Sequence, residues 1–389
     1  MPYYRRNLIV LSVTIFLAAL SWQQVVPFLP LFMREMGVEH NLLRWVGIVF
    51  AAQSVASIVT LPFWGKLGDR FGQKAMVIRA GVCLSAIYFG TSIASSPWEL
   101  TLYRFLNGAL TGFIPSSFAL IATNTPQERA PRAVATAQTA SAVGVIIGPA
   151  VGGLLAALLG YRGSLRVSGL AVAIATLLVW LLVQAPNKPR DVEETSLAQD
   201  FATALGSPIV SSVMLISLLG SMFHGAIQPI LVLHLGKMNH GAPDWLTGVV
   251  YALPAGAFVL TARRWTQFGE RWGFDRSVVV GLTVAAAFAV SLTFARSVWL
   301  FGPLFFMTGL FMAALSPSAA GITCTRVKGT FQGRAYGMQQ SASFTGALLA
   351  PLAATQVAAV LGMPAVFVFA GAVLLIGAMG FRRLVRKWG

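Results

Sequence analysis

Ionisable side chains inside the apolar stretches of this sequence are few, so each is a candidate for chemistry that needs a charge or a proton. Arg104 stands alone in the middle of one apolar run, and His224 lies in another among Gly, Ser and Met. Glu99 lies at the end of a run, and Asp69 lies in a charged break between two runs. Because histidine titrates near neutrality, His224 is a candidate for carrying a proton, and Glu99 and Asp69 are the other titrating candidates. A hydrogen-bonded core position is the alternative role for His224.

The same residue types do not form the sets that an enzyme or a metal site needs. No nucleophile–base pair and no His/Asp/Glu cluster falls within the apolar runs. Cys83 and Cys324 lie in separate runs, where small buried fillers are expected rather than a disulfide or a metal ligand set. We therefore expect no enzymatic activity, no metal and no cofactor.

The elements that must position these residues are long apolar helices. The chain has 389 residues, of which 56% are hydrophobic and only 10% charged, whereas soluble domains carry about 25% charged residues. About 20 apolar residues in a helix cross a bilayer core. The sequence predicts an all-α membrane protein with twelve transmembrane helices. The spans are expected near 7–33, 43–64, 75–95, 98–123, 132–159 and 165–185, then 208–235, 244–262, 277–295, 298–322, 334–360 and 364–381.

The distribution of basic residues predicts the orientation. The formal net charge is +16, but the cations lie at the ends of the runs rather than on one face, which argues against binding of nucleic acid. With the N-terminus inside, 21 Lys and Arg fall in cytoplasmic segments and six in outer loops. The positive-inside rule then places both termini in the cytoplasm. The first run is too long for the apolar part of a signal peptide, so we expect it to be a permanent span.

An internal repeat predicts two similar bundles. Residues of the first half recur in order at an offset of 201 or 202 positions, as in Gly144 and Gly346, Pro149 and Pro351, and Gly72 and Gly273. We expect six-helix bundles at 1–185 and 208–389, joined by a cytoplasmic linker at 186–207. Repeats of six helices insert with the same topology, so a pseudo-twofold axis runs along the membrane normal. Such folds bind their substrate between the halves, near the midplane.

Three motifs stand out within this frame. The segment 65–74 (GKLGDRFGQK) joins the second and third spans, 104–108 (RFLNG) lies inside the fourth, and 144–153 (GVIIGPAVGG) lies in the fifth. Glycines permit tight turns and close helix packing, and a proline lets a helix bend. With these motifs the whole chain resembles the major facilitator superfamily, and within it the twelve-helix drug/proton antiporters.

The resemblance implies roles for each motif. Asp69 would meet the N-terminal end of the eleventh span near Arg334 and lock the outward-open state; an ordinary charged loop is the alternative. Arg104 would couple protons, or would only hydrogen-bond carbonyls or glutamine side chains. The third motif would mark an exporter rather than an importer, although close packing alone could explain its glycines. The gate group comprises Gly65, Asp69, Arg70, Gly72, Lys74, Glu270, Arg271 and Arg334, and the antiporter motif Gly144, Gly148, Pro149, Gly152 and Gly153.

The resemblance also implies that spans 1, 4, 7 and 10 line the substrate cavity. Side chains there and on neighbouring spans are equally suited to ordinary packing. They are Trp22, Gln23, Asn107, Gln138, Gln228, Tyr251, Thr308, Gln340 and Phe344. The remaining lining is apolar, which favours a lipophilic ligand over a sugar. Where a relative has an acid in the first span this chain has Gln23, so Arg104 lacks an obvious counter-charge. That departure puts carboxylate coupling in doubt and suggests an anionic or amphiphilic ligand.

We therefore predict a secondary active transporter that exports lipophilic or amphiphilic small molecules, as multidrug efflux proteins do, by proton antiport and alternating access. A lipid or glycolipid flippase and an uncoupled facilitator are the alternatives; a sensor is disfavoured by the intact gate motif. The expected partners are the substrate, protons and membrane lipids. We expect a monomer in the inner (plasma) membrane of a prokaryote.

Overall fold

The computed structural model describes residues 3–126, 129–185, 206–238, 244–327 and 329–388, and within these ranges all regular structure is helical. Some side chains inside helices are also outside the description, namely those of 61, 62, 65, 66, 69, 131, 244 and 329–334. Most of the predicted linker, 186–205, lies outside the described residues.

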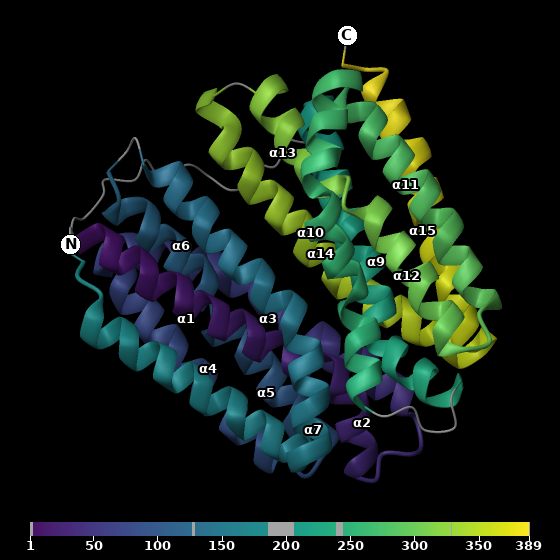
Figure 1. Ribbon diagram of the computed structural model, residues 1–389, viewed down its shortest axis with the longest axis horizontal. Helices are drawn as coiled ribbons and strands as arrows, with labels where there is room; N and C mark the ends of the chain where they lie inside the picture. The colour runs from purple at the N-terminus through teal and green to yellow at the C-terminus, as the bar shows by residue number, and fades with distance from the viewer. Residues whose placement is uncertain (1–2, 127–128, 186–205, 239–243, 328, 389) are drawn as a thin grey trace. The chain divides into compact units, whose positions relative to one another are not determined.

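The first half of the chain forms the purple-to-teal helices of Figure 1. They are α1 (Tyr3–Val25), the 3-10 turn η1 (Val26–Phe28), α2 (Leu29–Glu35), α3 (Leu42–Phe71), α4 (Gln73–Ile93), α5 (Pro97–Leu110), α6 (Phe113–Asn124) and α7 (Ala130–Leu182). The predicted first span is therefore interrupted at Pro27, where the ring removes a backbone donor. The predicted span 98–123 is likewise divided, at Gly112, whose φ of 123° no ordinary helix residue adopts.

The second half forms the green-to-yellow helices of Figure 1. They are α9 (Pro208–Met238), α10 (Asp244–Trp272), α11 (Phe274–Ser291), the 3-10 turn η2 (Leu292–Phe294), α12 (Val298–Met312), α13 (Leu315–Arg326), α14 (Gly329–Leu361) and α15 (Met363–Val385). The predicted span 298–322 is thus divided between α12 and α13, just as 98–123 is divided between α5 and α6.

The number of spans agrees with the prediction. In the described part of the chain, 11 segments are long and apolar enough to cross a membrane, and one of them, Arg132–Leu182, has 51 residues. Gly160 breaks that segment with φ 71° and ψ 171°. Since about 20 residues suffice for one crossing, the segment holds two spans, at the division that the sequence predicts between 132–159 and 165–185. The twelve-helix fold is confirmed.

Matching contacts in the two halves confirm the internal repeat. The indole Nε1 of Trp64 donates to the carbonyl of Ala109 at 2.6 Å, and 201 residues later Trp265 donates to the carbonyl of Leu310 at 2.8 Å. Ser96 and Ser297 cap the N-termini of α5 and α12 through backbone N–H groups three residues ahead. Gly72 and Gly273, with φ of 91° and 99°, make the two turns between α3 and α4 and between α10 and α11.

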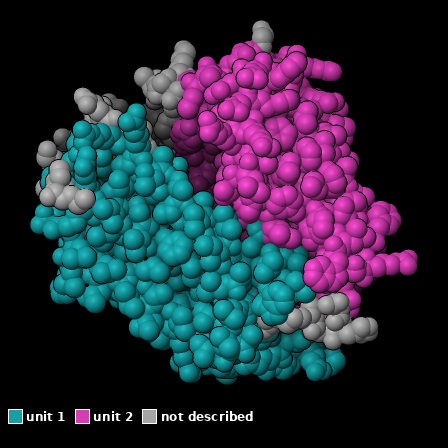
Figure 2. Space-filling view, in the orientation of Figure 1, with its two compact units in different colours: residues 1–42, 52–192, 243–252 teal, residues 43–51, 193–242, 253–389 magenta. Residues whose placement is uncertain are grey.

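The contacts of the chain divide it into two compact units, which Figure 2 colours separately. Unit 1 comprises 1–42, 52–192 and 243–252, and unit 2 comprises 43–51, 193–242 and 253–389. In unit 1, α1 and α4 pack against α7 around buried side chains such as Leu11, Val77 and Val179. In unit 2, α9 packs against α14 and α15. The predicted boundaries at 185 and 208 stay a prediction.

Candidate functional site

The buried face of α5 carries the arginine that the sequence singles out. The buried residues of this helix are Leu100, Arg104, Asn107 and Gly108, which at intervals of three and four share one side of an α-helix. Leu102 and Phe105 on other sides are exposed. An arginine in a membrane span is costly and faces the protein interior or water. The helical register of α5 therefore turns Arg104 inward while its apolar neighbours face out.

Close contact with α3 fixes the level of α5. A Cβ atom at Gly108 would overlap the backbone carbonyl of Gln53, so this position has room only for glycine. The carbonyl of Gly108 accepts hydrogen bonds from Ser57 Oγ at 3.3 Å and Thr60 Oγ1 at 3.2 Å. These contacts lie one helical turn from Arg104 and hold its helix against α3.

Polar side chains gather around Arg104 within unit 1. The hydroxyl groups of Tyr88, on α4, and Tyr251, on the first turns of α10, interact electrostatically with its guanidinium, and both tyrosines are buried. Gln53 and Asn107 are buried nearby, and in the described part of the chain Gln53 Oε1 and Asn107 Oδ1 accept no hydrogen bond. We call these five residues the Arg104 cluster. It offers a fixed cation, two hydroxyls and two amide oxygens to a polar or anionic group.

The glycines of the third motif bring α7 onto α1. A Cβ at Gly144 would lie 2.6 Å from the carbonyl oxygen of Phe16, and one at Gly148 would lie 2.7 Å from Gln23 Cβ. At Gly152 it would overlap the carbonyl of Gln24. Gly153 is also buried, and Pro149 lies inside α7 between Gly148 and Gly152. The motif therefore packs the backbones of two spans at van der Waals distance.

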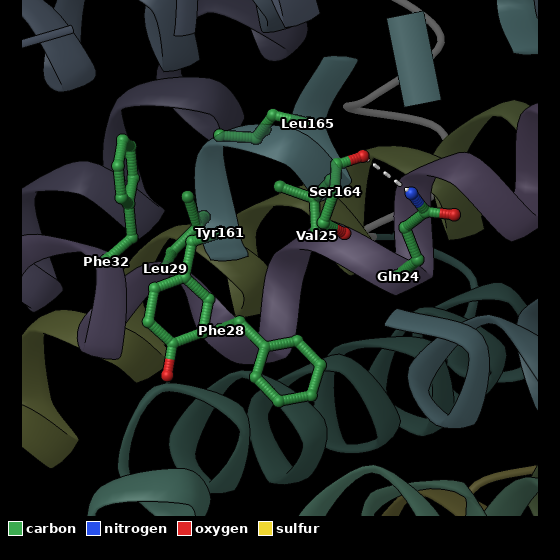
Figure 3. A pocket seen from close by; sticks show the side chains of 8 residues that line it. All are labelled: Gln24, Val25, Phe28, Leu29, Phe32, Tyr161, Ser164 and Leu165. Atoms are coloured by element: carbon green, nitrogen blue, oxygen red, sulfur yellow. Dashed lines mark hydrogen bonds between the residues drawn. The ribbon is translucent and has the colours of Figure 1, made fainter. Parts of the chain in front are cut away.

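Gln24 continues this contact and borders a small pocket. Its amide nitrogen donates to the carbonyl of Ser164 at 2.9 Å and to Ser168 Oγ at 2.5 Å. Figure 3 shows the amide aimed at Ser164, with Phe28 and Tyr161 next to each other farther along the pocket. The two rings stack at 6.2 Å. The pocket has a volume of about 10 Å³, which is about the space of one water molecule. It is too small for a transported molecule.

The other predicted cavity residues lie on several helices. His224 is exposed on α9, and its Nδ1 lies 2.8 Å from the carbonyl of Gly220. Thr308 is buried on α12 and donates to Leu304. Trp22, Gln138 and Gln340 are exposed, and Gln23, Gln228 and Phe344 are half-buried. Glu99 is exposed at the start of α5, where its carboxylate accepts the backbone N–H of Ser95 at 2.8 Å.

The gate residues are only partly within the description. Only the backbone is described for Gly65, Asp69 and Arg334, so the predicted contact of Asp69 with the eleventh span lies outside the described residues. Gly72 forms the turn after α3, and Lys74 Nζ donates to the carbonyl of Trp180 at 3.0 Å. Arg70, Glu270 and Arg271 are exposed.

A comparison with known families decides the identity of this fold. The model of the Major Facilitator Superfamily matches residues 11–295 and, in a second match, 245–387. The chain belongs to the Major Facilitator Superfamily. Among curated relatives, the "Multidrug resistance protein MdtG" of Escherichia fergusonii is 30% identical over 377 residues, covering 96% of this chain and 92% of that protein. The MdtG protein of Enterobacter lignolyticus is 29% identical and covers 99% and 94%.

Solved structures of major facilitators have the same fold. A bacterial homologue of the human lysosomal transporter Spinster matches with a TM-score of 0.81 at 14% identity, covering 100% of this chain and 98% of that one. The nucleoside transporter NupG matches with a TM-score of 0.78 at 14% identity and covers 99% of each chain. The human organic anion transporter MFSD10 matches with a TM-score of 0.71 at 16% identity, covering 98% and 100%.

Two polar residues of this major facilitator were not singled out from its sequence. Arg79, counted there with the loop cations, lies within α4, and its guanidinium carbon is 3.3 Å from the centroid of the Trp64 ring. His234 is buried on α9 beside the rings of Phe301 and Phe367. The signal for Arg79 was its distance from the loop motif, since four residues of helix separate it from Lys74. For His234 the signal was a second histidine in the same span.

Proposed function

We propose that this chain is a secondary active transporter that exports lipophilic or amphiphilic small molecules by alternating access, driven by proton antiport. The support is its membership of the major facilitators together with the name that its curated relatives carry over nearly their whole length. Those relatives are named for multidrug resistance. The structural observation that carries the proposal is the Arg104 cluster, which places one buried cation inside an apolar frame.

The proposed mechanism assigns different work to the parts already described. Residues 1–185 would rock against 208–389 around a midplane cavity, as in related secondary transporters. The gate group around Asp69 would latch the cytoplasmic side, and the glycines from Gly144 to Gly153 would form the surface that allows α7 to bend and slide on α1. Arg104 would bind the polar end of the substrate or exchange with a proton, with His224 and Glu99 as further coupling candidates.

The proposal also covers location and partners. Both termini would face the cytoplasm, and the protein would work as a monomer in a prokaryotic inner membrane, without enzymatic activity. The charge distribution of the sequence supports this orientation, because most Lys and Arg would then lie inside.

A second candidate, a flippase for an anionic lipid or glycolipid, follows from one observation. The spans expected to line the cavity contain Arg104 and no acid apart from Glu99 at the end of the fourth, and the neighbours that the structure gives it include two tyrosine hydroxyls. A cation in such a setting suits an anionic headgroup that remains attached to its acyl chains.

The experiment is efflux of a lipophilic cationic dye from proteoliposomes under an imposed proton gradient. Wild type is compared with Arg104→Ala and with Arg166→Ala, a control that removes an exposed cation. Gradient-driven efflux that is lost only in Arg104→Ala supports the exporter. A wild type that moves no dye with or without a gradient overturns it, and transfer of a fluorescent anionic lipid between leaflets then tests the flippase.

A further inference from the structure

One cavity of unit 2 lies at the ends of its helices rather than in the middle of a span. It has a volume of about 430 Å³ and is enclosed by the end of α10, the start of α11 and the end of α15. Its lining contains three arginines, Arg276, Arg382 and Arg386, and one carboxylate, Asp275. Two aromatic rings and three valines complete it.

The electrostatic balance of this cavity is positive. Three guanidinium groups face a single carboxylate, and in the described part of the chain none of the three arginines forms an ion pair. The Asp275 carboxylate folds back over Gly273 at the start of its own helix, where a negative charge complements the helix dipole. The arginines are therefore available to an anion. Arginine donates in a planar fork that matches the oxygens of a phosphate.

The other side of the cavity is apolar and continues along the helices. Phe268 and Trp272 stack at 6.4 Å in its wall. On α15, Leu375 and Met379 precede Arg382 and Arg386 at intervals of four, three and four residues, so all four share one helix face. Leu375 and Met379 are exposed, as hydrocarbon-facing side chains are. An apolar strip of the spanning part of α15 thus leads directly to the arginines.

The first half of the chain does not repeat this arrangement. The residues equivalent to Arg276 and Arg386 are Ala75 and Gln184. Lys74, the equivalent of Asp275, donates to the carbonyl of Trp180, the residue equivalent to Arg382. In the first half, this hydrogen bond therefore lies at the positions that correspond to the cavity of the second half. The three arginines of the cavity are therefore a feature of the second half alone. They are not explained by the general excess of cations at the helix ends of both halves.

We propose that this cavity binds the phosphate of an anionic phospholipid from the cytoplasmic leaflet. The arginines hold the headgroup, the aromatic pair lies beside the glycerol, and the acyl chains follow Leu375 and Met379 along α15. A free phosphate would not use the apolar strip. Basic pockets between helices on the cytoplasmic side are known binding places for such headgroups. The proposal uses the proposed orientation of the termini, and it does not depend on what the protein transports.

The test is native mass spectrometry of the purified full-length protein, titrated with phosphatidylglycerol and, in parallel, with phosphatidylcholine. The cavity variant is Arg276→Ala/Arg382→Ala/Arg386→Ala. Its matched control, Arg264→Ala/Arg383→Ala/Lys387→Ala, removes the same charge from exposed positions that do not line the cavity. We expect phosphatidylglycerol to bind the cavity variant at least about tenfold more weakly than wild type. The control should stay within about twofold of wild type.

Three outcomes overturn the proposal: an equal loss in both variants, no loss in the cavity variant, or equal affinity of the wild type for the two lipids. Displacement of the lipid by millimolar inorganic phosphate would assign the site to free phosphate instead. Because the three arginines are exposed, their removal should leave folding intact, which the thermal unfolding midpoint verifies. Single variants at Arg382 and Arg386 repeat the comparison with less perturbation. Transport is not measured, so failure of the exporter proposal leaves this result unaffected.

Discussion

The guanidinium of Arg79 lies over the indole of Trp64, with its central carbon 3.3 Å from the ring centroid. The same indole donates to the carbonyl of Ala109, and Arg79 Nη2 donates to the carbonyl of Thr111 at 3.5 Å. Both carbonyls lie where α5 ends and Gly112 interrupts the span. Such carbonyls have lost their helical partners and need others in a membrane. Trp64 and Arg79 therefore provide hydrogen-bond donors for the backbone carbonyls at the break between α5 and α6.

Replacing the tryptophan tests this assignment. Trp64→Phe keeps a ring beside Arg79 but removes the hydrogen bond to Ala109, which should cost about 1 kcal/mol. We expect the thermal unfolding midpoint of the purified protein to fall by about 1 °C. Trp265→Phe removes the equivalent bond to Leu310 and should cause a similar fall. Unchanged midpoints in both variants would contradict the role of the repeated indole.

Arg104 should be sensitive to shape as well as charge. In Arg104→Ala, gradient-driven efflux should fall at least about tenfold, because removing one partner of a buried charge interaction costs about 2–5 kcal/mol. Arg104→Lys keeps the charge but loses the planar fork, so we expect partial recovery. Initial efflux rates in proteoliposomes with equal protein content measure both. Full activity of Arg104→Ala would remove the Arg104 cluster from the mechanism.

The glycines of α7 should differ sharply from glycines in open space. Gly152→Ala places a methyl group against the carbonyl of Gln24, and overpacking of this kind costs about 1–3 kcal/mol. Gly256→Ala, on α10, meets no atom within 4 Å and should gain up to about 1 kcal/mol through helix propensity. Thermal unfolding of the two variants should therefore shift in opposite directions. An unchanged or higher midpoint for Gly152→Ala would mean that α1 and α7 are not in close contact at this position.

The two histidines of α9 should behave differently on replacement. His224 is exposed and held by its Nδ1 near the carbonyl of Gly220, so His224→Ala should leave the unfolding midpoint nearly unchanged. If His224 couples protons, the ratio of efflux with and without a gradient falls to about one, the value of an uncoupled carrier. His234 is buried against Phe301 and Phe367. His234→Ala should instead lower the midpoint, because it leaves a cavity. A full gradient response in His224→Ala would exclude the histidine as a coupling site.

Most of the fold could be predicted from the sequence because membrane spans have a compositional signature. Long apolar runs, basic ends and the repeat offset gave the twelve spans, including the division that Gly160 makes inside Arg132–Leu182. The division at Gly112 was not predicted, since a glycine in an apolar run is equally compatible with close packing. Only the structure shows its φ of 123° and the groups that bind the freed carbonyls.

The cation of the candidate site, Arg104, could be predicted from the sequence, but the residues that surround it could not. Arg104 is conspicuous because an arginine in a span is rare. Its electrostatic interaction with Tyr88 and Tyr251 depends on how three helices pack, and no spacing in the sequence encodes that. Arg79 was counted with the cytoplasmic cations, and not singled out, for a related reason. A cation near the end of a span counts toward orientation, and an aromatic partner on another helix is visible only in three dimensions.

The hydrogen bond of Trp64 is kept in the second half as that of Trp265, while Arg79 is matched there by Val280. Two copies of one contact at a fixed offset are what the duplication of an ancestral gene leaves behind. The shared indole bond then belongs to the inheritance common to both copies, and the cation beside Trp64 belongs to the divergence of one copy. At the same position the other copy has a valine that lines the arginine-rich cavity. The same ancestral position thus holds a structural cation in one half, and in the other half a side chain in the wall of the proposed lipid cavity.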